Sequence, residues 1–227
     1  WQNLTRPGKK SKNSMPEHPF EIVAFGEVLW DLLPDGAAIL GGAPFNFINR
    51  INERGDRGHM ISRVGLDEYG DRALAKMHQL GMNTSLMQRD REHPTGTVEV
   101  YLDENRNPDY KIIRNVAYDF VHFEEGIEDA VSVADCICFG SLIQRNDVSR
   151  EALQRALSFF CGKYVFYDIN LRKDCYNMEI ITESLRHANI LKMNNDELAM
   201  IGDLLGMGSA SSIEIVQTLV GEYDLRY

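Results

Sequence analysis

Residues 167–172 read Tyr-Asp-Ile-Asn-Leu-Arg and residues 194–197 read Asn-Asn-Asp-Glu, and these two stretches decide the fold. Each follows a short apolar run typical of a β-strand, residues 164–167 in the first case and 189–193 in the second. Ligands of open α/β sheets bind at the carboxyl ends of the strands. An arginine at one such end and an Asn/Glu pair at another suit a phosphate group and its metal ion.

Helices and strands alternate regularly around these stretches, from residue 127 onward. The expected helices cover residues 128–133, 148–161, 178–188, 197–205 and 213–223. The expected strands cover residues 137–139, 164–167 and 189–193. This order predicts a mostly parallel sheet with helices on both faces. The sequence stops just after an expected helix, where the alternation calls for a further strand, so we expect an incomplete sheet.

The first half of the chain has a different pattern of apolar and polar residues. Apolar patterns predict strands at 20–25, 59–64 and 85–88, and helices at 45–53 and 67–80. Residues 95–102 alternate, residues 103–109 are polar, and residues 110–113 are apolar again, which predicts a hairpin with a long loop. This hairpin has little apolar content of its own, so we expect it to project from the main body.

Composition narrows the class of protein. The chain has 227 residues, of which 44% are hydrophobic, enough for one large core. Its net charge of −10 and the absence of a basic stripe argue against a nucleic-acid partner. No apolar run reaches the length of a membrane span and no signal peptide is visible, so we expect no membrane partner. Residues 1–18 are expected to be a flexible tail, and residues 19–227 an α/β domain.

Four cysteines are present, at positions 136, 138, 161 and 175. Cys136 and Cys138 alternate within an apolar run, so they are expected on one face of a strand. Their spacing matches no common zinc site. Buried reduced thiols are the expected state, and they favour a cytoplasmic location.

Two features near the amino terminus suit a small polar ligand. Residues 41–46 read Gly-Gly-Ala-Pro-Phe-Asn, in which Gly41 and Gly42 allow close backbone approach and Asn46 offers donors and acceptors. An ordinary loop with a helix-initiating proline explains this pattern as well. Asp31 lies among apolar residues, where its carboxylate needs a partner or a wet cleft. It suits two sugar hydroxyl groups, and an exposed strand edge is the alternative.

The stretches 167–172 and 194–197 also have alternative explanations. The planar fork of Arg172 suits a phosphate group, but a surface ion pair would use it too. Asn194 and Glu197 share one side of a first helical turn, where Glu197 suits Mg²⁺ through a water molecule. The same pair is also the pattern of a helix capping box, and the two roles are compatible.

Taken together, these motifs resemble the ribokinase-like (PfkB) carbohydrate kinases. The resemblance rests on residues 41–46, Gly55, residues 63–70 (Arg-Val-Gly-Leu-Asp-Glu-Tyr-Gly), residues 139–142 (Phe-Gly-Ser-Leu) and the two opening stretches, in the family's order. Residues 26–34, Gly-Glu-Val-Leu-Trp-Asp-Leu-Leu-Pro, resemble the fructokinase branch in particular. The similarity extends from about residue 20 to residue 227.

The resemblance implies an α/β ribokinase-like fold and ATP-dependent, Mg²⁺-assisted phosphorylation of a sugar hydroxyl group, with fructose or a related small carbohydrate as substrate. It implies a β lid built from about residues 29–40 and 95–119, through which such kinases often form homodimers. It places Arg172 near the transferred phosphate, and Asn194 and Glu197 on the motif linked to phosphate and Mg²⁺. The sugar would contact Asp31, Gly41, Gly42 and Asn46. Glu99 and Tyr101 alternate onto one face of the lid and are further substrate candidates.

One family motif is missing from the sequence. Asp-Thr-x-Gly-Ala-Gly-Asp, which supplies the aspartate base and the anion hole, follows the Asn-x-x-Glu motif in the family and does not occur here. We therefore expect the carboxyl-terminal part of the fold to be missing and this chain alone to have little or no kinase activity. The alternative is a non-catalytic sugar-binding or regulatory protein derived from such a kinase.

Overall fold

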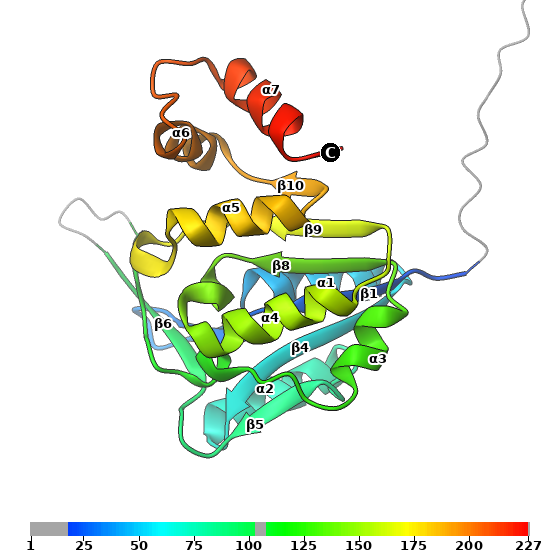
Figure 1. Ribbon diagram of the computed structural model, residues 1–227. Coiled ribbons are helices and arrows are strands. Elements are labelled where there is room, and N and C mark those ends of the chain that lie inside the picture. Colours follow the sequence, from blue (N-terminus) through cyan, green and yellow to red (C-terminus); the bar gives the residue numbers. More distant parts are fainter. Residues whose placement is uncertain (1–17, 103–107, 227) are drawn as a thin grey trace, which may run out of the picture.

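The computed structural model describes residues 18–102 and 108–226 (Figure 1). The expected tail over residues 1–18 and most of the expected polar turn over residues 103–109 lie outside these ranges. Within them, no helix is both long enough and apolar enough to cross a membrane.

A six-stranded sheet forms the centre of the described chain. Its order is β10-β9-β8-β1-β4-β5, and every neighbouring pair is parallel. The strands are β1 (Glu21–Phe25), β4 (Arg57–Gly65), β5 (Met87–Asp90), β8 (Cys136–Gly140), β9 (Tyr164–Asp168) and β10 (Ile190–Lys192). The parallel sheet expected from the alternation of helices and strands is therefore confirmed, although β5 begins two residues later than expected.

Helices cover both faces of this sheet (Figure 1). They are α1 (Ala43–Glu53), α2 (Glu68–Gln79), α3 (Ile127–Ser132), α4 (Asp147–Phe159), α5 (Met178–His187), α6 (Asn195–Leu204) and α7 (Ser212–Glu222). Short 3₁₀ helices lie at Ala117–Phe120, Leu142–Arg145 and Lys173–Cys175. Side chains of α1 and α2 share one apolar cluster, and those of α3 to α7 share the other.

Strand β1 shows why both faces are apolar. Ile22 and Ala24 belong to the cluster under α1, whereas Val23 and Phe25 belong to the opposite cluster. Successive side chains of a strand point to opposite faces, so a strand covered on both sides needs an unbroken apolar run. Cys136 and Cys138 lie together in the first cluster, on one face of β8 as expected.

The cysteine expectation holds for three of the four residues. Cys136, Cys138 and Cys175 are buried free thiols, but Cys161 is exposed. Cys161 follows the end of α4, in the connection to β9, where no element covers it. The expectation of burial is therefore wrong for Cys161.

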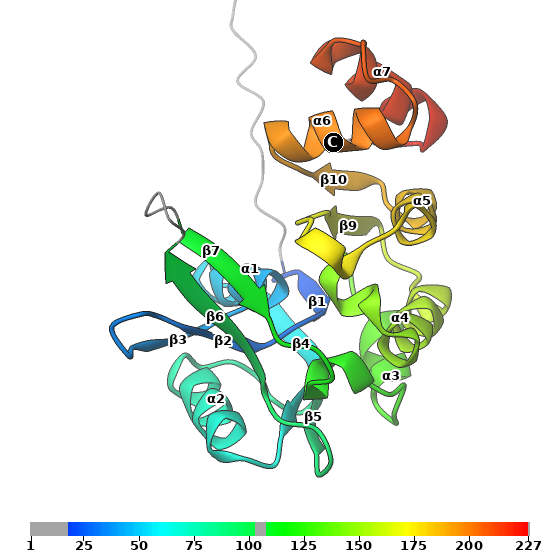
Figure 2. The same cartoon turned by 90° about the vertical axis from the view of Figure 1, so that its left-hand side faces the viewer.

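A second, four-stranded sheet lies beside the first (Figure 2). Its order is β3-β2-β6-β7, with strands β2 (Leu29–Leu32), β3 (Ala38–Gly41), β6 (Gly96–Leu102) and β7 (Pro108–Ile112). Strands β6 and β7 are antiparallel, which confirms the expected hairpin, while β2 pairs with β6 in parallel. Its role as a lid stays a prediction.

Polar groups fasten the second sheet to the main body. Arg145 donates to the carbonyl oxygen of Ile113 at 2.6 Å, directly after β7, and pairs with the buried Asp119 at 2.7 Å. On the other side, the indole nitrogen of Trp30 donates to the carbonyl oxygen of Tyr69 at 3.0 Å. The second sheet therefore has fixed attachment points at both of its ends.

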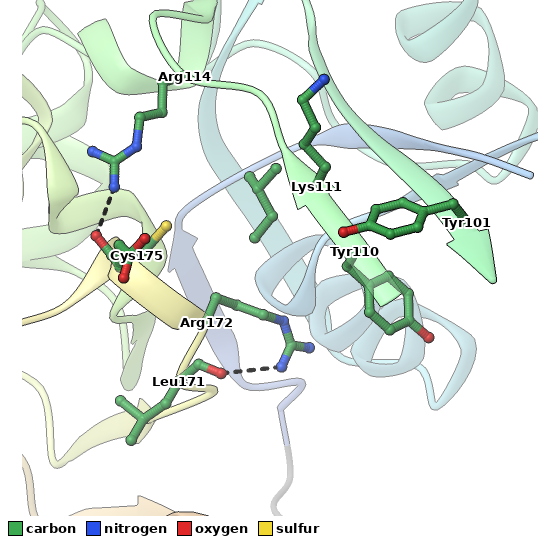
Figure 3. A pocket seen from close by; sticks show the side chains of 9 residues that line it. Tyr101, Tyr110, Lys111, Arg114, Leu171, Arg172 and Cys175 are labelled. Carbon is green, nitrogen blue, oxygen red and sulfur yellow. Dashed lines mark hydrogen bonds between the residues drawn. The ribbon is translucent and has the colours of Figure 1, made fainter. Parts of the chain in front are cut away.

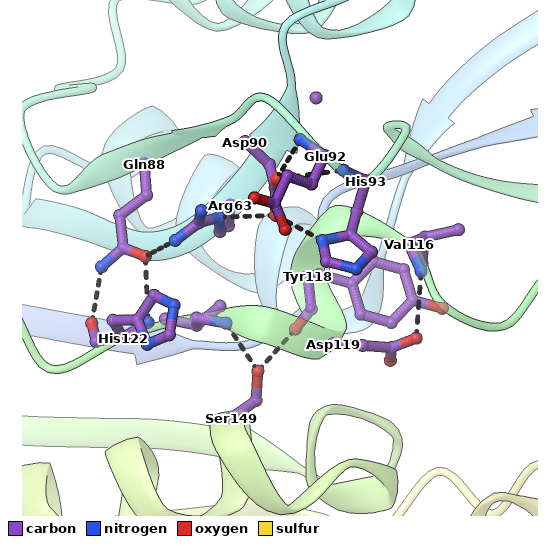
Figure 4. Close-up of polar contacts among 12 residues, drawn as sticks. Arg63, Gln88, Asp90, Glu92, His93, Val116, Tyr118, Asp119, His122 and Ser149 are labelled. Atoms are coloured by element: carbon purple, nitrogen blue, oxygen red, sulfur yellow. Dashed lines mark hydrogen bonds and ion pairs between the residues drawn. The ribbon is translucent and has the colours of Figure 1, made fainter.

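A further buried network holds the loop between β5 and β6 (Figure 4). The carboxylate of Asp90 accepts from Arg63 Nε at 2.9 Å, from the amides of Glu92 and His93 at 2.8 and 3.0 Å, and contacts His93 Nδ1 at 3.1 Å. The His93 ring stacks on Phe120 with 3.7 Å between centroids. These partners hold the pKa of Asp90 down at about 2, against the opposing effect of burial.

Candidate functional site

A polar cavity of about 570 Å³ lies where the carboxyl ends of the central strands meet the second sheet. Ends of parallel strands on one edge of a sheet are the usual place for a ligand. Seven polar residues line the cavity: Glu27, Asp31, Asn46, Asp168, Asn170, Arg172 and Lys192. Apolar side chains such as Leu29 and Val98 complete the lining, so a small polar molecule would find both hydrogen-bond partners and an apolar surface.

Asp31 enters the cavity from β2. Burial raises the pKa of Asp31, and the nearby charge of Arg172 opposes that rise. Gly41 on β3 pairs with Leu29, two residues before Asp31, and a β-carbon there would lie 3.0 Å from Asp31 Oδ2. Gly41 does not line the cavity itself. It makes room for the Asp31 carboxylate, which leaves that group able to accept hydrogen bonds from a ligand.

Gly42 and Asn46 belong to the amino-terminal end of α1. Gly42 has φ 117°, a region that favours glycine, and a β-carbon there would meet the carbonyl oxygen of Glu27. The amide of Ala43 donates to Glu27 Oε1 at 3.0 Å. Asn46 lies one turn into the helix and lines the cavity together with Gly42. The Gly-Gly-Ala-Pro stretch is therefore both a helix start and a cavity wall.

Arg172 faces these groups from the loop after β9. Its guanidinium donates to the carbonyl oxygen of Leu171 at 3.3 Å, and its charge acts on Glu27, Asp31 and Asp168. Asp168, the last residue of β9, pairs with Lys192 at 2.9 Å. Burial raises the pKa of Asp168, and Lys192 opposes the rise. The cavity thus carries two cations and three carboxyl groups.

Hydrogen bonds pin the loop that carries Arg172. The hydroxyl of Ser141 donates to the carbonyl oxygen of Ile169 at 2.6 Å, and the amide of Leu171 donates to Glu197 Oε1 at 3.0 Å. Asn170 between them has φ 37°, a left-handed conformation that asparagine tolerates better than most residues. The loop is therefore held to the start of α6, and residues 167–172 are in direct contact with residues 194–197.

Asn194 and Glu197 form a capping box at the start of α6. The Glu197 amide donates to Asn194 Oδ1 and the Asn194 amide to Glu197 Oε2, each at 2.8 Å. Neither residue lines the cavity. Both carboxylate oxygens of Glu197 accept backbone amides and the residue is 5% exposed.

These contacts bear on the expected Mg²⁺ site. Mg²⁺ takes oxygen ligands, usually one or two carboxylates with phosphate oxygens and water. A buried glutamate whose two oxygens already accept backbone amides does not fit a direct ligand. No cluster of three or more acidic, histidine or cysteine side chains suited to a metal occurs in the part of the chain that the structure describes. Mg²⁺ therefore stays a prediction.

A second cavity of about 410 Å³ adjoins the first between β7 and the loop after β9 (Figure 3). Arg172 and Tyr110 line both cavities, and Figure 3 shows the Arg172 guanidinium extending toward Tyr110. Tyr101 lines only the second cavity. Glu99 lines neither cavity and pairs with Lys111 at 2.9 Å on the hairpin.

Three charged residues of the cavity were missed as site residues in the sequence: Glu27, Asp168 and Lys192. Each stands at or just after the carboxyl end of a central strand, namely β1, β9 or β10. Position at a strand end, the signal that singled out Arg172, was available for all three. What the sequence did not show is that β1 and β9 are separated only by β8, which brings their ends to one cavity.

Comparison with known proteins gives a consistent result. The model of the pfkB family of carbohydrate kinases matches residues 32–223. A sugar kinase of Pyrococcus horikoshii is 27% identical over 194 residues, which cover 78% of this chain and 62% of the relative. A fructokinase of Vibrio alginolyticus is 26% identical over 201 residues, which cover 82% of this chain and 64% of the relative. The chain thus spans less than two thirds of the length of these relatives.

Solved structures show the same fold. The crystal structure of an uncharacterized sugar kinase from Pyrococcus horikoshii, 26% identical, superposes with a TM-score of 0.74 and covers 82% of this chain and 66% of that one. The fructokinase from Xylella fastidiosa, 20% identical, superposes with a TM-score of 0.78 over 88% of this chain and 67% of that one. The ribokinase-like α/β architecture expected from the sequence is confirmed.

Proposed function

Because the chain belongs to the pfkB family of carbohydrate kinases, we propose that it provides the sugar-binding part of an ATP-dependent sugar kinase. The proposed substrate is fructose or a related small carbohydrate, since fructokinases are among the relatives. The proposed reaction transfers the γ-phosphoryl group of ATP to a sugar hydroxyl group.

One observation carries the proposal: a single cavity places Asp31, Gly42 and Asn46 across from Arg172. Asp31 accepts hydrogen bonds from neighbouring sugar hydroxyls, and Asn46 can donate and accept. The guanidinium of Arg172 has the planar geometry that binds phosphate oxygens in pairs. The sugar would therefore lie against β2 and α1, with its reacting hydroxyl group directed to the Arg172 side.

ATP is the proposed phosphate donor, with Mg²⁺ as its companion ion. Support for ATP comes from the Pyrococcus horikoshii sugar kinase, of which a crystal structure in complex with ATP is similar to this chain at 26% identity and a TM-score of 0.73. When bound, Mg²⁺ would neutralise charge on the phosphates. Asn194 and Glu197 would serve mainly by holding the Arg172 loop to α6.

We further propose that the 227-residue polypeptide alone transfers phosphate very slowly. It does not contain the Asp-Thr-x-Gly-Ala-Gly-Asp motif that carries the base and anion hole in similar kinases. A positioned general base contributes roughly 10²–10⁴-fold to rate, and an anion-hole donor roughly 10²–10³-fold. Measuring ATP-dependent fructose phosphorylation by this polypeptide tests the point, and ordinary turnover would refute it.

Fructose titration by calorimetry tests the binding site itself. Asp31→Asn should weaken fructose affinity by roughly 10- to 100-fold, because hydrogen bonds to a charged acceptor contribute about 1.5–3 kcal/mol. Asp35→Asn, in the exposed turn before β3, is the matched control and should bind like the wild type. Equal affinities in the two variants would place the sugar elsewhere, and an absence of fructose binding by the wild type would overturn the proposed site.

A second candidate is a non-catalytic sugar-binding or regulatory protein. The observation that favours it is the same cavity, where Asp31 and Asn46 can hold a sugar whether or not ATP binds. Titration with ATP separates the candidates. Binding of fructose together with ATP supports the kinase, whereas binding of fructose without ATP supports the regulatory protein.

The second sheet is the proposed lid over the sugar and the proposed homodimer contact. Its support is position and exposure: β6 and β7 border both cavities, and Ile39 on β3 is 54% exposed. Sedimentation at rising protein concentration tests the dimer. The cytoplasm is the proposed location, supported by the free buried thiols Cys136, Cys138 and Cys175.

A further inference from the structure

Glu27 is the most unusual polar residue of the cavity. It stands two residues after β1, is 2% exposed and lines the cavity. Its Oε1 accepts the amide of Ala43, but its Oε2 is buried with no hydrogen-bond partner in the described structure. A buried polar atom left unpaired is costly and rare in native proteins, so it calls for an explanation.

The surroundings indicate which form of the carboxyl group is present. Burial raises the pKa of Glu27 to about 7, the Asp168 charge adds to the rise, and Arg172 opposes it. The ionisable groups that line the cavity around Glu27 or respond to its charge are Asp31, Asp168, Arg172, Lys192, Tyr118 and Cys138. With Asp31 and Asp168 both raised in pKa by burial, a third negative charge here is unfavourable. A protonated Glu27 offers a donor that no described group accepts.

We propose that Glu27 positions the sugar: Oε1 fixes the Gly42–Ala43 turn, and Oε2 donates a hydrogen bond to a hydroxyl group of the bound substrate. This inference rests on the proposed function of the cavity and adds a residue to it. Asp31 then accepts from the sugar while Glu27 donates to it. A polyol supplies both kinds of partner, because each of its hydroxyl groups donates and accepts.

The arrangement couples sugar binding to a proton. In the free protein Glu27 loses its proton as the pH rises through about 7, whereas in the sugar complex Glu27 retains it. Fructose affinity of the wild type should therefore fall by roughly tenfold or more between about pH 6 and about pH 8.5. Above neutral pH, binding should take up close to one proton, which calorimetry in buffers of different ionisation enthalpy measures.

Glu27→Gln is the diagnostic variant. The amide keeps an oxygen for Ala43 and supplies a donor that does not titrate, so fructose affinity should vary by less than about twofold across the same pH range. Glu53→Gln, near the exposed end of α1, is the control and should keep the wild-type profile. A purely structural Glu27 would lower the melting temperature in the variant but leave the pH profile of affinity unchanged.

The outcomes separate this inference from the proposed function. Wild-type binding of fructose with no proton uptake overturns the role of Glu27 and assigns Oε2 to a bound water molecule. The same steep pH profile in Glu27→Gln also overturns it, while the sugar site stands. An absence of fructose binding by the wild type at any pH overturns both.

Discussion

Two buried carboxyl groups of this molecule have opposite surroundings. Asp90, between β5 and β6, accepts from an arginine and two backbone amides and contacts a histidine, and its pKa lies near 2. Glu27, at the floor of the cavity, has one amide partner and a pKa near 7. Both are 2% exposed, so burial alone does not decide their charge. The balance between burial, which raises the pKa of Glu27, and the donors aimed at the carboxyl group, which outweigh burial at Asp90, decides it.

The contrast separates a region used for architecture from one kept for a ligand. Around Asp90 both carboxylate oxygens are satisfied by groups of the chain itself (Figure 4). In the cavity, Glu27 Oε2 has no hydrogen-bond partner, and Gly41, which has no side chain, leaves space beside the Asp31 carboxylate. Unused hydrogen-bonding capacity in a cavity is what a small polar substrate needs.

The largest expected effect comes from the glycine that packs against Glu27. Gly42→Ala should lower the free energy of unfolding by roughly 3 to 5 kcal/mol, because a positive φ and a clash with the Glu27 carbonyl oxygen combine. Gly36→Ala is the matched control: its φ is +86° but nothing lies within 4 Å, so about 1 kcal/mol is expected. Urea denaturation measures both, and equal losses would show that the cavity floor is not tightly packed.

The next effect is the pH dependence of stability, for which Glu27 has an unusual sign. The folded protein binds this proton more tightly than the unfolded chain, so the stabilisation is present below about pH 4.5 and is lost as the pH rises through about 7. The loss amounts to about 3 kcal/mol. Glu27→Gln should remove this slope between those pH values, as followed by denaturation at each pH. If the free energy of unfolding of the wild type rose with pH over this range, and Glu27→Gln showed the same slope, the raised pKa would be contradicted.

Asp90 should give a smaller change of opposite sign. Its pKa is depressed from 3.8 to about 2, so the stabilisation is present above about pH 4 and is lost as the pH falls through about 2. After allowance for solvent screening, Asp90→Asn should cost about 1 to 2 kcal/mol at neutral pH and flatten the acid limb. Asp56→Asn, which neutralises a carboxylate that accepts from the Phe20 amide, serves as a comparison without a buried ion pair. An acid limb that persists in Asp90→Asn would assign it to other carboxylates.

The sequence predicts the fold of this molecule better than it predicts the site. The alternation of apolar runs and helical patterns was sufficient for the parallel sheet, because each strand covered on both faces leaves an unbroken apolar run. Helix starts with a local cap were predictable to within one residue, as at Asp67 and Asn177, whose side chains accept amides of α2 and α5. The short strands β2 and β3 lacked a clear period, because only pairing defines them, β3 with β2 and β2 with β6.

For the site, strand ends located Arg172 but left Glu27 and Lys192 unassigned. Their convergence depends on the strand order, which places β8 between β1 and β9 and which no local pattern encodes. The capping box at Asn194 and Glu197 shows the reverse case. The local pattern gave the contact correctly, and the structure adds the link to Leu171 that ties it to the loop of Arg172.

The position of β1 in the sheet has a consequence for synthesis. One edge of β1 pairs with β4 and the other with β8, whose first paired residue lies 114 positions beyond Ile22. At about 5–20 residues per second, a ribosome needs roughly 6 to 23 s to make that stretch. During this interval the strand destined for the middle of the sheet keeps one row of backbone groups open, the arrangement most prone to pair with another chain. The nascent polypeptide is therefore most vulnerable to aggregation before residue 140 leaves the ribosome.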